Sequence, residues 1–393
     1  MSAGGNNTFV AKNYAAYSSG SIVYTGGSGD DSLTFDDYLA YGGGTATFDM
    51  SLGGNNTLVA GDYAADSGSL SYTGGSGDDS LTFDGYLAYQ GGTATFDMSA
   101  GGNNTFVAGN YAASGGSLSF TGGSGDDNLT FGDDLAYEGG TATFDMSAGG
   151  NNTIVAGSSA AYSSGSIVYT GGSGDDSLTF GTLLAHDNGI ATFDMSLGGN
   201  NTLVAGTAAA SSPGMDGAGG AASFSGSISY EGGSGDDSLT FGNFLVFSGG
   251  NATFNMSAGG NNTFVAEDYA ASGGSIAYTG GLGEDSLTFG TYLAAFSGTA
   301  TFDLGDDTAA DIVTFQGSIG ESGGAVAIRN FNFNDDTIDV AAGVSATTGE
   351  ITDATGDLTW TDSGGRHTIV FEDIGTGGAG AVATAAQLIA DII

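Results

Sequence analysis

Short segments in which hydrophobic and polar residues alternate recur throughout the chain. In the segment SLTF (residues 32–35), Leu33 and Phe35 alternate with Ser32 and Thr34, as in a strand with one buried face. The segment TATFD (residues 45–49) alternates in the same way, and both types recur many times. A turn rich in Gly and acids precedes SLTF, and a looser loop rich in Tyr and Ala follows it. The pattern therefore predicts two short strands in each repeating unit.

The turns define the length of that unit. The motif GGSGDDSLTF begins at Gly26 and recurs from Gly74, Gly171 and Gly232, with the variants GGSGDDNLTF from Gly122 and GGLGEDSLTF from Gly280. A second motif, GGNNTFVA, begins at Gly4 and has close copies from Gly53, Gly101, Gly149, Gly198 and Gly259. Asn7, Asp31 and Asn56 take equivalent places in successive motifs, so one coil has about 24 residues.

This organisation predicts an all-β fold, a right-handed parallel β-roll (β-solenoid), over residues 1–316. We expect residues 206–227 to form a surface loop insertion, and residues 317–393 to form a small β-rich cap with a terminal helix. The coils that run from an acid motif to an Asn motif are longer, which predicts a β-bulge near Asp49 and Met50. The predicted core contains Leu33, Phe35, Leu81, Phe83, Leu129, Phe131, Leu178, Phe180, Leu239 and Phe241 on one sheet, and Ile22, Phe48, Leu70, Phe96, Leu118, Phe144, Ile167, Phe193 and Phe254 on the other.

The charge of the chain limits its partners. The 393 residues include 44 acids and 3 Lys or Arg, which gives a net charge of −41. Nucleic acid and anionic membranes are therefore poor partners, and no apolar run approaches the roughly 20 residues needed to span a bilayer. Asp far outnumbers Glu, and Asp in Gly-rich turns is a typical oxygen ligand of Ca²⁺. There is no Cys, so disulfides play no part.

The acid motif resembles the nonapeptide G-G-x-G-x-D-x-U-x of RTX proteins, which are secreted calcium-binding β-rolls. That resemblance implies several bound Ca²⁺ ions, held by acids and by the carbonyl groups of glycine turns. The acids at or beside the family's ligand position are Asp30, Asp31, Asp78, Asp79, Asp126, Asp127, Asp175, Asp176, Asp236, Asp237, Glu284 and Asp285. The turn glycines that the resemblance places at the sites include Gly27, Gly29, Gly75, Gly77, Gly123 and Gly125.

The Asn motifs allow two interpretations. Their side chains could supply neutral oxygens to the same ions, or they could form an Asn ladder without metal. The residues concerned are Asn7, Asn56, Asn104, Asn152, Asn201 and Asn262.

The C-terminal part carries two further resemblances. Residues 328–340 resemble the segment that closes many RTX β-rolls, and AAQLIADII (residues 385–393) resembles the uncleaved C-terminal signal of type I secretion substrates. They imply a bacterial protein that is secreted to the extracellular space or the cell surface.

Other residue patterns are weaker signals. Threonine pairs predict outward hydroxyl rows that resemble ice-binding faces, but ordinary outward β-strand threonines are the favoured explanation. The residues are Thr45, Thr47, Thr93, Thr95, Thr141, Thr143, Thr299 and Thr301. Tyrosines such as Tyr14, Tyr38 and Tyr63 are expected to shield the loop edge of the core. His186 and His367 are isolated, and no set of residues suited to catalysis can be composed around them.

These observations predict a protein that is not an enzyme. We expect a secreted calcium-binding structural protein that assembles with itself, head to tail, into a filament, surface layer or biofilm matrix. A cell-surface polysaccharide is a further candidate partner. The alternative is an adhesin or an ice-binding module that uses the Thr and Ser rows.

Overall fold

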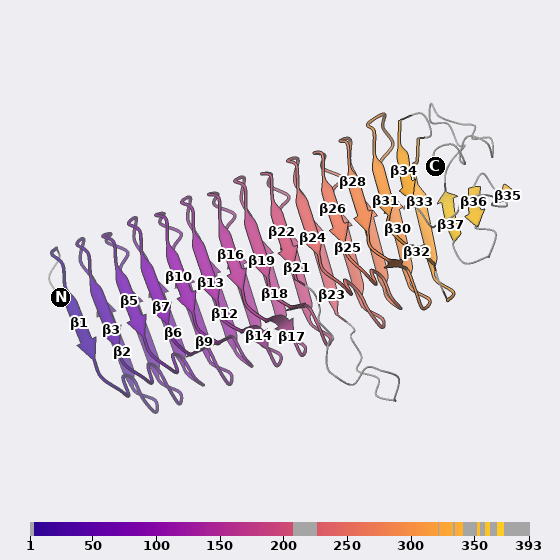
Figure 1. Cartoon of the computed structure of the whole chain (residues 1–393). Coiled ribbons are helices and arrows are strands. Elements are labelled where there is room, and N and C mark those ends of the chain that lie inside the picture. Colours follow the sequence, from indigo (N-terminus) through magenta and orange to yellow (C-terminus); the bar gives the residue numbers. More distant parts are fainter. Residues whose placement is uncertain are drawn as a thin grey trace, which may run out of the picture. The chain divides into compact units, whose positions relative to one another are not determined.

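The computed structural model describes residues 4–206, 226–320, 322–332 and 335–340, together with the backbone of three strands within residues 352–372. The chain is a parallel β-solenoid of about 13 coils with about 24 residues each, and the described residues contain no helix. The chain divides into two compact units, unit 1 (Met1–Leu197) and unit 2 (Gly198–Ile393). Figure 1 shows the strands of each unit stacked in chain order.

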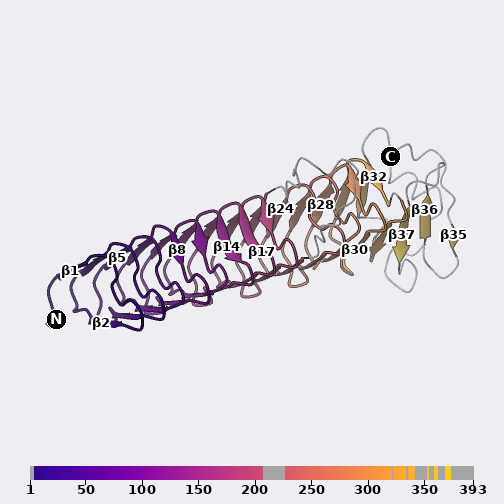
Figure 2. The ribbon, with the colours of Figure 1, turned by 90° about the horizontal axis from the view of Figure 1, so that it is seen from below.

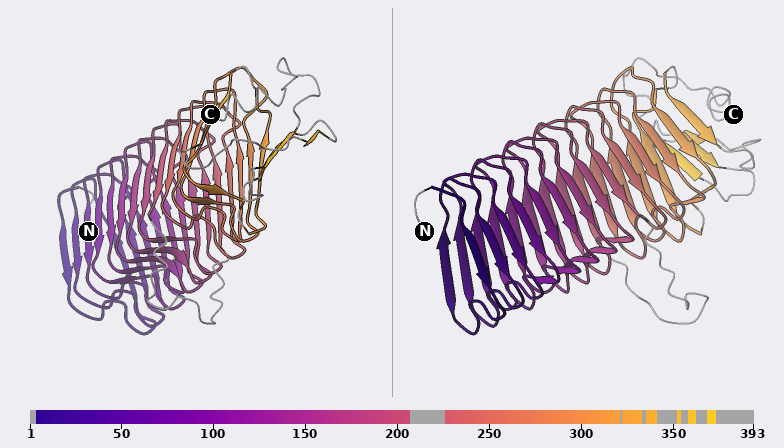
Figure 3. Two further views of the ribbon diagram at one scale, coloured as in Figure 1. Left: turned by 45° about the vertical axis from the view of Figure 1, so that its right-hand side comes forward. Right: turned by 60° about the vertical axis from the view of Figure 1, so that its left-hand side comes forward.

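Unit 1 has two long sheets, and each coil contributes one strand to each of them. The first sheet contains β1 (Thr8–Ala11), β3 (Ser32–Phe35), β5 (Thr57–Ala60), β7 (Ser80–Phe83), β10 (Thr105–Ala108), β13 (Asn128–Phe131), β16 (Thr153–Ala156) and β19 (Ser177–Phe180). The second contains β2 (Ser21–Thr25), β4 (Thr45–Asp49), β6 (Ser69–Thr73), β9 (Thr93–Asp97), β12 (Ser117–Thr121), β15 (Thr141–Asp145), β18 (Ser166–Thr170) and β21 (Ile190–Asp194). All pairings are parallel and in register, for example Phe9↔Leu33 and Leu33↔Leu58, and Figure 3 shows the two sheets of the coils facing each other.

The loop edge of unit 1 carries a third, short sheet that the sequence pattern did not predict. It contains β8 (Tyr86–Leu87), β11 (Tyr111–Ala112), β14 (Asp134–Tyr137), β17 (Ser159–Tyr162) and β20 (Leu183–Leu184), and several of these strands are visible in Figure 2. Alanines in these loops, such as Ala40 (φ 52°) and Ala88 (φ 52°), adopt the left-handed conformation and are buried. The loop is therefore tightly folded rather than loose.

Unit 2 has the same architecture. Its first sheet contains β22 (Thr202–Ala205), β24 (Ser238–Phe241), β26 (Thr263–Ala266), β28 (Ser286–Phe289), β31 (Ile312–Phe315) and β34 (Thr337–Val340). Its second sheet contains β23 (Ser227–Glu231), β25 (Asn251–Asn255), β27 (Ser275–Thr279), β30 (Thr299–Asp303), β33 (Ala325–Arg329), β37 (Thr368–Glu372), β36 (Leu358–Thr361) and β35 (Thr352–Asp353), and β29 (Tyr292–Leu293) pairs with β32 (Ser318–Ile319) at the loop edge.

The parallel stack extends beyond the expected boundary at residue 316. β34 pairs in parallel with β31, and β33 pairs in parallel with both β30 and β37. Antiparallel pairing begins only where β36 joins β37. Residues 207–225 of the expected loop and the expected terminal helix lie outside the described residues.

The core prediction is confirmed for all its residues except Ile22, which is only half-buried in the first coil. The structure adds a column of buried methionines at the turn end of the second sheet of unit 1, Met50, Met98, Met146 and Met195, and Met256 is buried at the same repeat position of unit 2. The expected β-bulge near Asp49 is wrong, because Asp49 stays in register with Thr73. The extra residue instead lies in the turn after it, where the Gly53 N–H donates to the Met50 carbonyl over 3.1 Å.

Candidate functional site

The two adjacent residues at the end of each turn have opposite environments. The first of each pair, for example Asp30 or Asp78, is exposed, whereas the second, for example Asp31 or Asp79, is buried. The buried acids are Asp31, Asp79, Asp127, Asp176, Asp237 and Asp285, and the Asn residues at the same position of the intervening coils are buried in all coils but the first, where Asn7 is half-buried. The sequence correctly predicted one row along the turns, but the row consists of two columns that differ in exposure.

Within each unit the buried column is a hydrogen-bonded ladder, which we call the inner ladder. The main-chain N–H of Asp31 donates to Oδ1 of Asn56 over 3.0 Å, and the N–H of Asn56 donates to Oδ1 of Asp79 over 2.8 Å. The same bonds link Asp79, Asn104, Asp127 and Asn152 in order. Each buried side chain thus accepts a hydrogen bond from a main-chain N–H group of the preceding coil. Without this bond, the buried N–H group would have no acceptor.

The exposed column forms a second ladder, the outer ladder, with the opposite direction. The N–H of Asp30 donates to Oδ1 of Asn6 over 3.0 Å, and the N–H of Asn55 donates to Oδ1 of Asp30 over 2.8 Å. Here each side chain accepts the N–H of the following coil, as Asn55 does from Asp78 over 2.9 Å. The turns of adjacent coils are therefore joined in both directions.

The turn backbone explains why Asp and Asn alternate in the inner ladder. In an acid turn, the Gly27 N–H points at the side chain and donates to Oδ2 of Asp31 over 3.0 Å. In an Asn turn, carbonyl groups point at the side chain instead, and Nδ2 of Asn56 donates to the Gly54 carbonyl and to Oδ1 of Asp79, each over 3.0 Å. A carboxylate only accepts hydrogen bonds and an amide can also donate, so each turn type matches one residue.

A buried tyrosine accompanies most of the inner acids. The Tyr278 hydroxyl donates to Oδ2 of Asp285 over 2.9 Å. In an earlier coil Tyr72 is close to Asp79: burial, followed by the negative charge of Asp79, raises the pKa of Tyr72 well above its ordinary value, but the Tyr72 hydroxyl makes no hydrogen bond there. The sequence analysis missed this pair, although a Tyr seven residues before the acid recurs at Tyr24, Tyr72, Tyr169, Tyr230 and Tyr278.

Glycine is required where these side chains meet. A methyl group on Gly74 would lie 2.6 Å from Oδ2 of Asp79 and 2.7 Å from Sδ of Met98. The glycines of the predicted calcium motif divide into two groups. Gly27 presents its N–H to the inner acid, as do Gly75 and Gly123, whereas Gly29, Gly77 and Gly125 pack their carbonyl groups against a glycine of the next coil.

The environment of the buried acids disfavours the charged form. Burial raises the pKa of Asp79, Asp127, Asp176 and Asp285, while hydrogen bonds from Asn and Gly oppose the rise. The pKa of Asp237 rises to about 6 for the same reason. Buried carboxylates that lack a counter-charge are costly, so these coils favour either protonation or a nearby cation.

The alternation fails in unit 2, where three acids follow one another in the inner ladder. The N–H of Asp285 donates to Oδ1 of Asp311 over 2.7 Å, and the N–H of Asp311 donates to Oδ1 of Asp336 over 3.0 Å. Burial, together with repulsion from Asp336 and Asp285, raises the pKa of Asp311 to about 8, and the pKa of Asp336 rises to about 6. The sequence analysis named neither Asp311 nor Asp336, because their turns depart from both motifs.

The fit to calcium differs between the two ladders. Both oxygens of the inner Asp31 accept N–H groups, so a metal ion would compete with donors there. Oδ2 of Asp79, Asp127 and Asp237, in contrast, is buried and has no hydrogen-bond partner. Oδ1 of the exposed Asp30 and Asp78 accepts one N–H, and the exposed side of each carboxylate faces solvent. Within the described parts of the chain, no three His, Cys, Asp or Glu side chains are grouped for one ion. The outer acids, which are exposed and have carbonyl groups nearby, are therefore the more accessible candidates for Ca²⁺.

The remaining candidate residues lie on the faces and at the loop edge. Thr45, Thr47, Thr93 and Thr95 are exposed on the second sheet, where Thr93 donates to Oγ of Ser69 over 3.2 Å. Tyr14, Tyr38, Tyr63, Tyr86 and Tyr111 form a stack with ring centroids 4.8–5.2 Å apart. His186 packs on Tyr162, and His367 lies outside the described residues.

Comparison with protein-family models, curated proteins and solved structures finds no match. In the portion of the chain that could be searched, no helix is long and apolar enough to cross a membrane.

Proposed function

We propose that this chain is a structural protein that assembles with copies of itself into an extracellular filament, layer or matrix. The observation that carries the proposal is the unpaired edge of the first coil that the structure describes. Among the described residues, β1 and β2 are paired on one side only, by β3 and β4. Phe9 is half-exposed there, whereas Leu33 and Leu58, its partners along the sheet, are completely buried. A strand edge of this kind favours addition of another β-strand, and a second copy in the same register would supply one.

A contact of this type joins unlike surfaces, so it propagates into a filament unless it closes into a ring. The ladders support the same arrangement. Asn7 accepts nothing from a preceding coil among the described residues, although its own N–H donates to Oδ1 of Asp31 over 2.8 Å. A further coil from another copy would extend both ladders by one step.

We propose further that Ca²⁺ binds along the turns and supports folding and assembly. Its ligands would be exposed outer acids such as Asp30, Asp78 and Asp126, together with turn carbonyl groups. The support is electrostatic, because each acid turn places an exposed and a buried carboxylate side by side in a chain of net charge −41. Bound Ca²⁺ would supply the positive charge that these turns lack, and secretion into a calcium-rich exterior would suit this requirement.

Electron microscopy of the purified chain with and without Ca²⁺ tests the assembly. We expect ordered filaments or sheets with Ca²⁺ and dispersed particles in EGTA. A folded domain fused directly to Met1 should block the unpaired edge and prevent assembly, whereas the same domain joined to Met1 through a long flexible linker, which leaves the edge accessible, serves as a matched control. Normal assembly of the direct fusion would show that copies meet through other surfaces.

The exposed hydroxyl rows favour one other function, that of an ice-binding or adhesive module. Ser69, Thr93, Ser117 and Thr141 follow one another along the second sheet, and the Ser117 and Thr141 hydroxyls are 2.7 Å apart. Chains that stay dispersed in Ca²⁺ but adsorb to ice or to a polysaccharide would favour this second function over self-assembly.

A further inference from the structure

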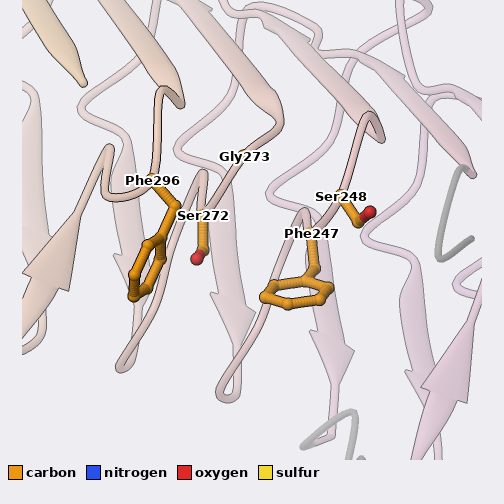
Figure 4. A pocket seen from close by; sticks show the side chains of 5 residues that line it. All are labelled: Phe247, Ser248, Ser272, Gly273 and Phe296. Atoms are coloured by element: carbon orange, nitrogen blue, oxygen red, sulfur yellow. The ribbon is translucent and has the colours of Figure 1, made fainter. Parts of the chain in front are cut away.

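An apolar hollow with a volume of about 440 Å³ opens at the loop edge of unit 2. Phe247, Ser248, Ser272, Gly273 and Phe296 line it, and Figure 4 shows the two aromatic rings on opposite sides. The coils around it are joined by main-chain hydrogen bonds, from Ser272 to Val246 over 3.0 Å and from Gly273 to Ala295 over 2.9 Å. The hollow therefore has a preformed frame.

The hollow arises because an aromatic column is interrupted. In unit 1 the loop position three residues after the Tyr14 position often holds a ring, and the rings of Tyr137 and Tyr162 stack there with centroids 5.3 Å apart. In unit 2 Phe247 holds this position, but the next two coils have Ser272 and Ala295. The next aromatic residue is Phe296, one position later. Its own φ is 49°, and the residue is 60 % exposed. Two successive rings of the column are thus missing.

Ser272 gives the hollow a polar group. Its side chain is only 1 % exposed, and its Oγ has no hydrogen-bond partner. Figure 4 shows this hydroxyl in the space between the rings of Phe247 and Phe296. A buried hydroxyl without a partner destabilises its surroundings, and a ligand that bonds to it recovers that loss.

We propose that this hollow binds a single planar aromatic ring that carries an uncharged hydroxyl group, a ligand of the phenol class. An aromatic ring fills the same position in several other coils, and the two Phe rings offer faces and edges for it to pack against. The Ser272 hydroxyl pairs with the phenol hydroxyl. The volume is within the range of small-molecule pockets, and the strongly negative chain disfavours anionic ligands.

Ligand-observed saturation-transfer NMR on the full chain tests the proposal, with p-cresol as the probe. We expect saturable binding in roughly the millimolar range, as ligand efficiency allows for so small a molecule. Ser272→Phe restores a ring to the column and should abolish binding. Ser272→Ala should weaken p-cresol binding about threefold to tenfold through loss of one hydrogen bond, while leaving the binding of toluene unchanged.

Ser114 provides the matched control. It holds the same loop position in unit 1, is equally buried, and does not line the hollow, so Ser114→Ala should bind p-cresol like the original chain. Circular dichroism of each variant checks that it remains folded.

Three results would overturn the proposal. Unchanged p-cresol binding by Ser272→Phe would exclude the hollow as the site. Equal binding of p-cresol by Ser272→Ala and the original chain would exclude the Ser272 hydrogen bond. Saturation of N-acetylglucosamine or of 4-hydroxyphenylacetate without saturation of p-cresol would show that the ligand class is wrong.

Discussion

At the scale of single residues, the turns select between Asp and Asn by hydrogen-bond polarity. Oδ1 of Asp127 accepts from both the N–H and the Nδ2 group of Asn104, each over 2.9 Å, and the Gly123 N–H faces its carboxylate. Nδ2 of Asn104 in turn donates to Asp127 and to the Gly102 carbonyl. The Asp127 site thus presents only hydrogen-bond donors to its side chain, whereas the Asn104 site presents mostly acceptors.

Exchanging the two residue types should therefore destabilise the chain in either direction. In Asp127→Asn, either orientation of the amide places an NH₂ group against an N–H donor, at a cost of about 1–3 kcal/mol. In Asn104→Asp, the new carboxylate faces the Gly102 carbonyl and Asp127, with a similar cost that should shrink at low pH, where the new carboxyl is protonated. Chemical denaturation in EGTA measures both changes.

The outer acid of the same turn is the control for this prediction. In Asp126→Asn the Oδ1 atom can still accept the Asn151 N–H, now at 2.7 Å, and the new NH₂ group faces solvent. We expect a change within about 0.5 kcal/mol. Equal effects of Asp126→Asn and Asp127→Asn would contradict the explanation from turn polarity.

Asp311 is the residue whose replacement should increase stability. Its pKa of about 8 means that the folded chain binds a proton there at pH 7, whereas the unfolded chain, with an ordinary pKa near 3.8, does not. Asp311→Asn keeps the acceptor for the Asp285 N–H and removes this proton uptake. The free energy of unfolding should rise by on the order of 2–4 kcal/mol at pH 7, and the gain should nearly vanish at pH 4. Thermal denaturation at both pH values measures it, and a loss of stability at pH 7 would refute the assignment.

At the scale of the structural element, the turn glycines determine how closely adjacent coils can stack. Adjacent glycines in one turn differ in this respect. Both Gly101 (φ 113°) and Gly102 (φ 91°) have positive φ, but a methyl group on Gly101 meets nothing within 4 Å, whereas one on Gly102 would overlap the Gly77 carbonyl oxygen. Only Gly102 therefore needs glycine for stacking as well as for its backbone conformation.

Alanine substitutions separate these two requirements. Gly101→Ala should cost about 1–2 kcal/mol, the strain of a side chain at positive φ. Gly102→Ala should cost well above about 3 kcal/mol, because two coils must move apart and both ladders lengthen locally. Hydrogen exchange should show faster exchange at the turns of the adjacent coils for Gly102→Ala alone. Similar losses from the two substitutions would show that stacking does not limit the coil.

At the scale of the whole molecule, stability should depend on pH in the opposite sense to ordinary acid denaturation. Several inner acids have raised pKa values, namely Asp237 and Asp336 at about 6 and Asp311 at about 8. The folded state then binds more protons than the unfolded state between about pH 4 and pH 8. The resulting stability is fully present below about pH 4 and is lost as the pH rises through the folded-state values.

In a chelating buffer, the thermal midpoint should therefore fall by several degrees between pH 5 and pH 8, since each kcal/mol corresponds to about 2–4 °C in units of this size. If Ca²⁺ binds the turns as proposed, it should raise the midpoint more at pH 8 than at pH 5, because the turns carry more charge at pH 8. Circular dichroism melts at the two pH values measure both effects. A midpoint that increases with pH in the chelating buffer would contradict the raised pKa values.

The sequence by itself determined the period of the coils, the positions of the two long strands and the identity of the buried Leu and Phe residues. These follow from alternation within segments of four or five residues, which is a local property that repetition makes unambiguous. It also identified a row of acids and Asn residues along the turns. The absence of a bulge near Asp49 and the third short strand at the loop edge depend on contacts between coils, and local alternation carries no information about them.

Only the tertiary structure decided what the turn residues do. Asp30 and Asp31 are neighbours in the chain, yet one is exposed and the other is buried beneath hydrogen bonds from Asn7, 24 residues away. The direction of each ladder depends on which way the N–H and carbonyl groups of a stacked turn point, and that orientation is set by the adjacent coil. The missing rings beside Ser272 are visible as a hollow only once Phe247 and Phe296 are placed across it. Hydrogen-bond direction and cavity shape are properties of stacked coils, so no single repeat contains them.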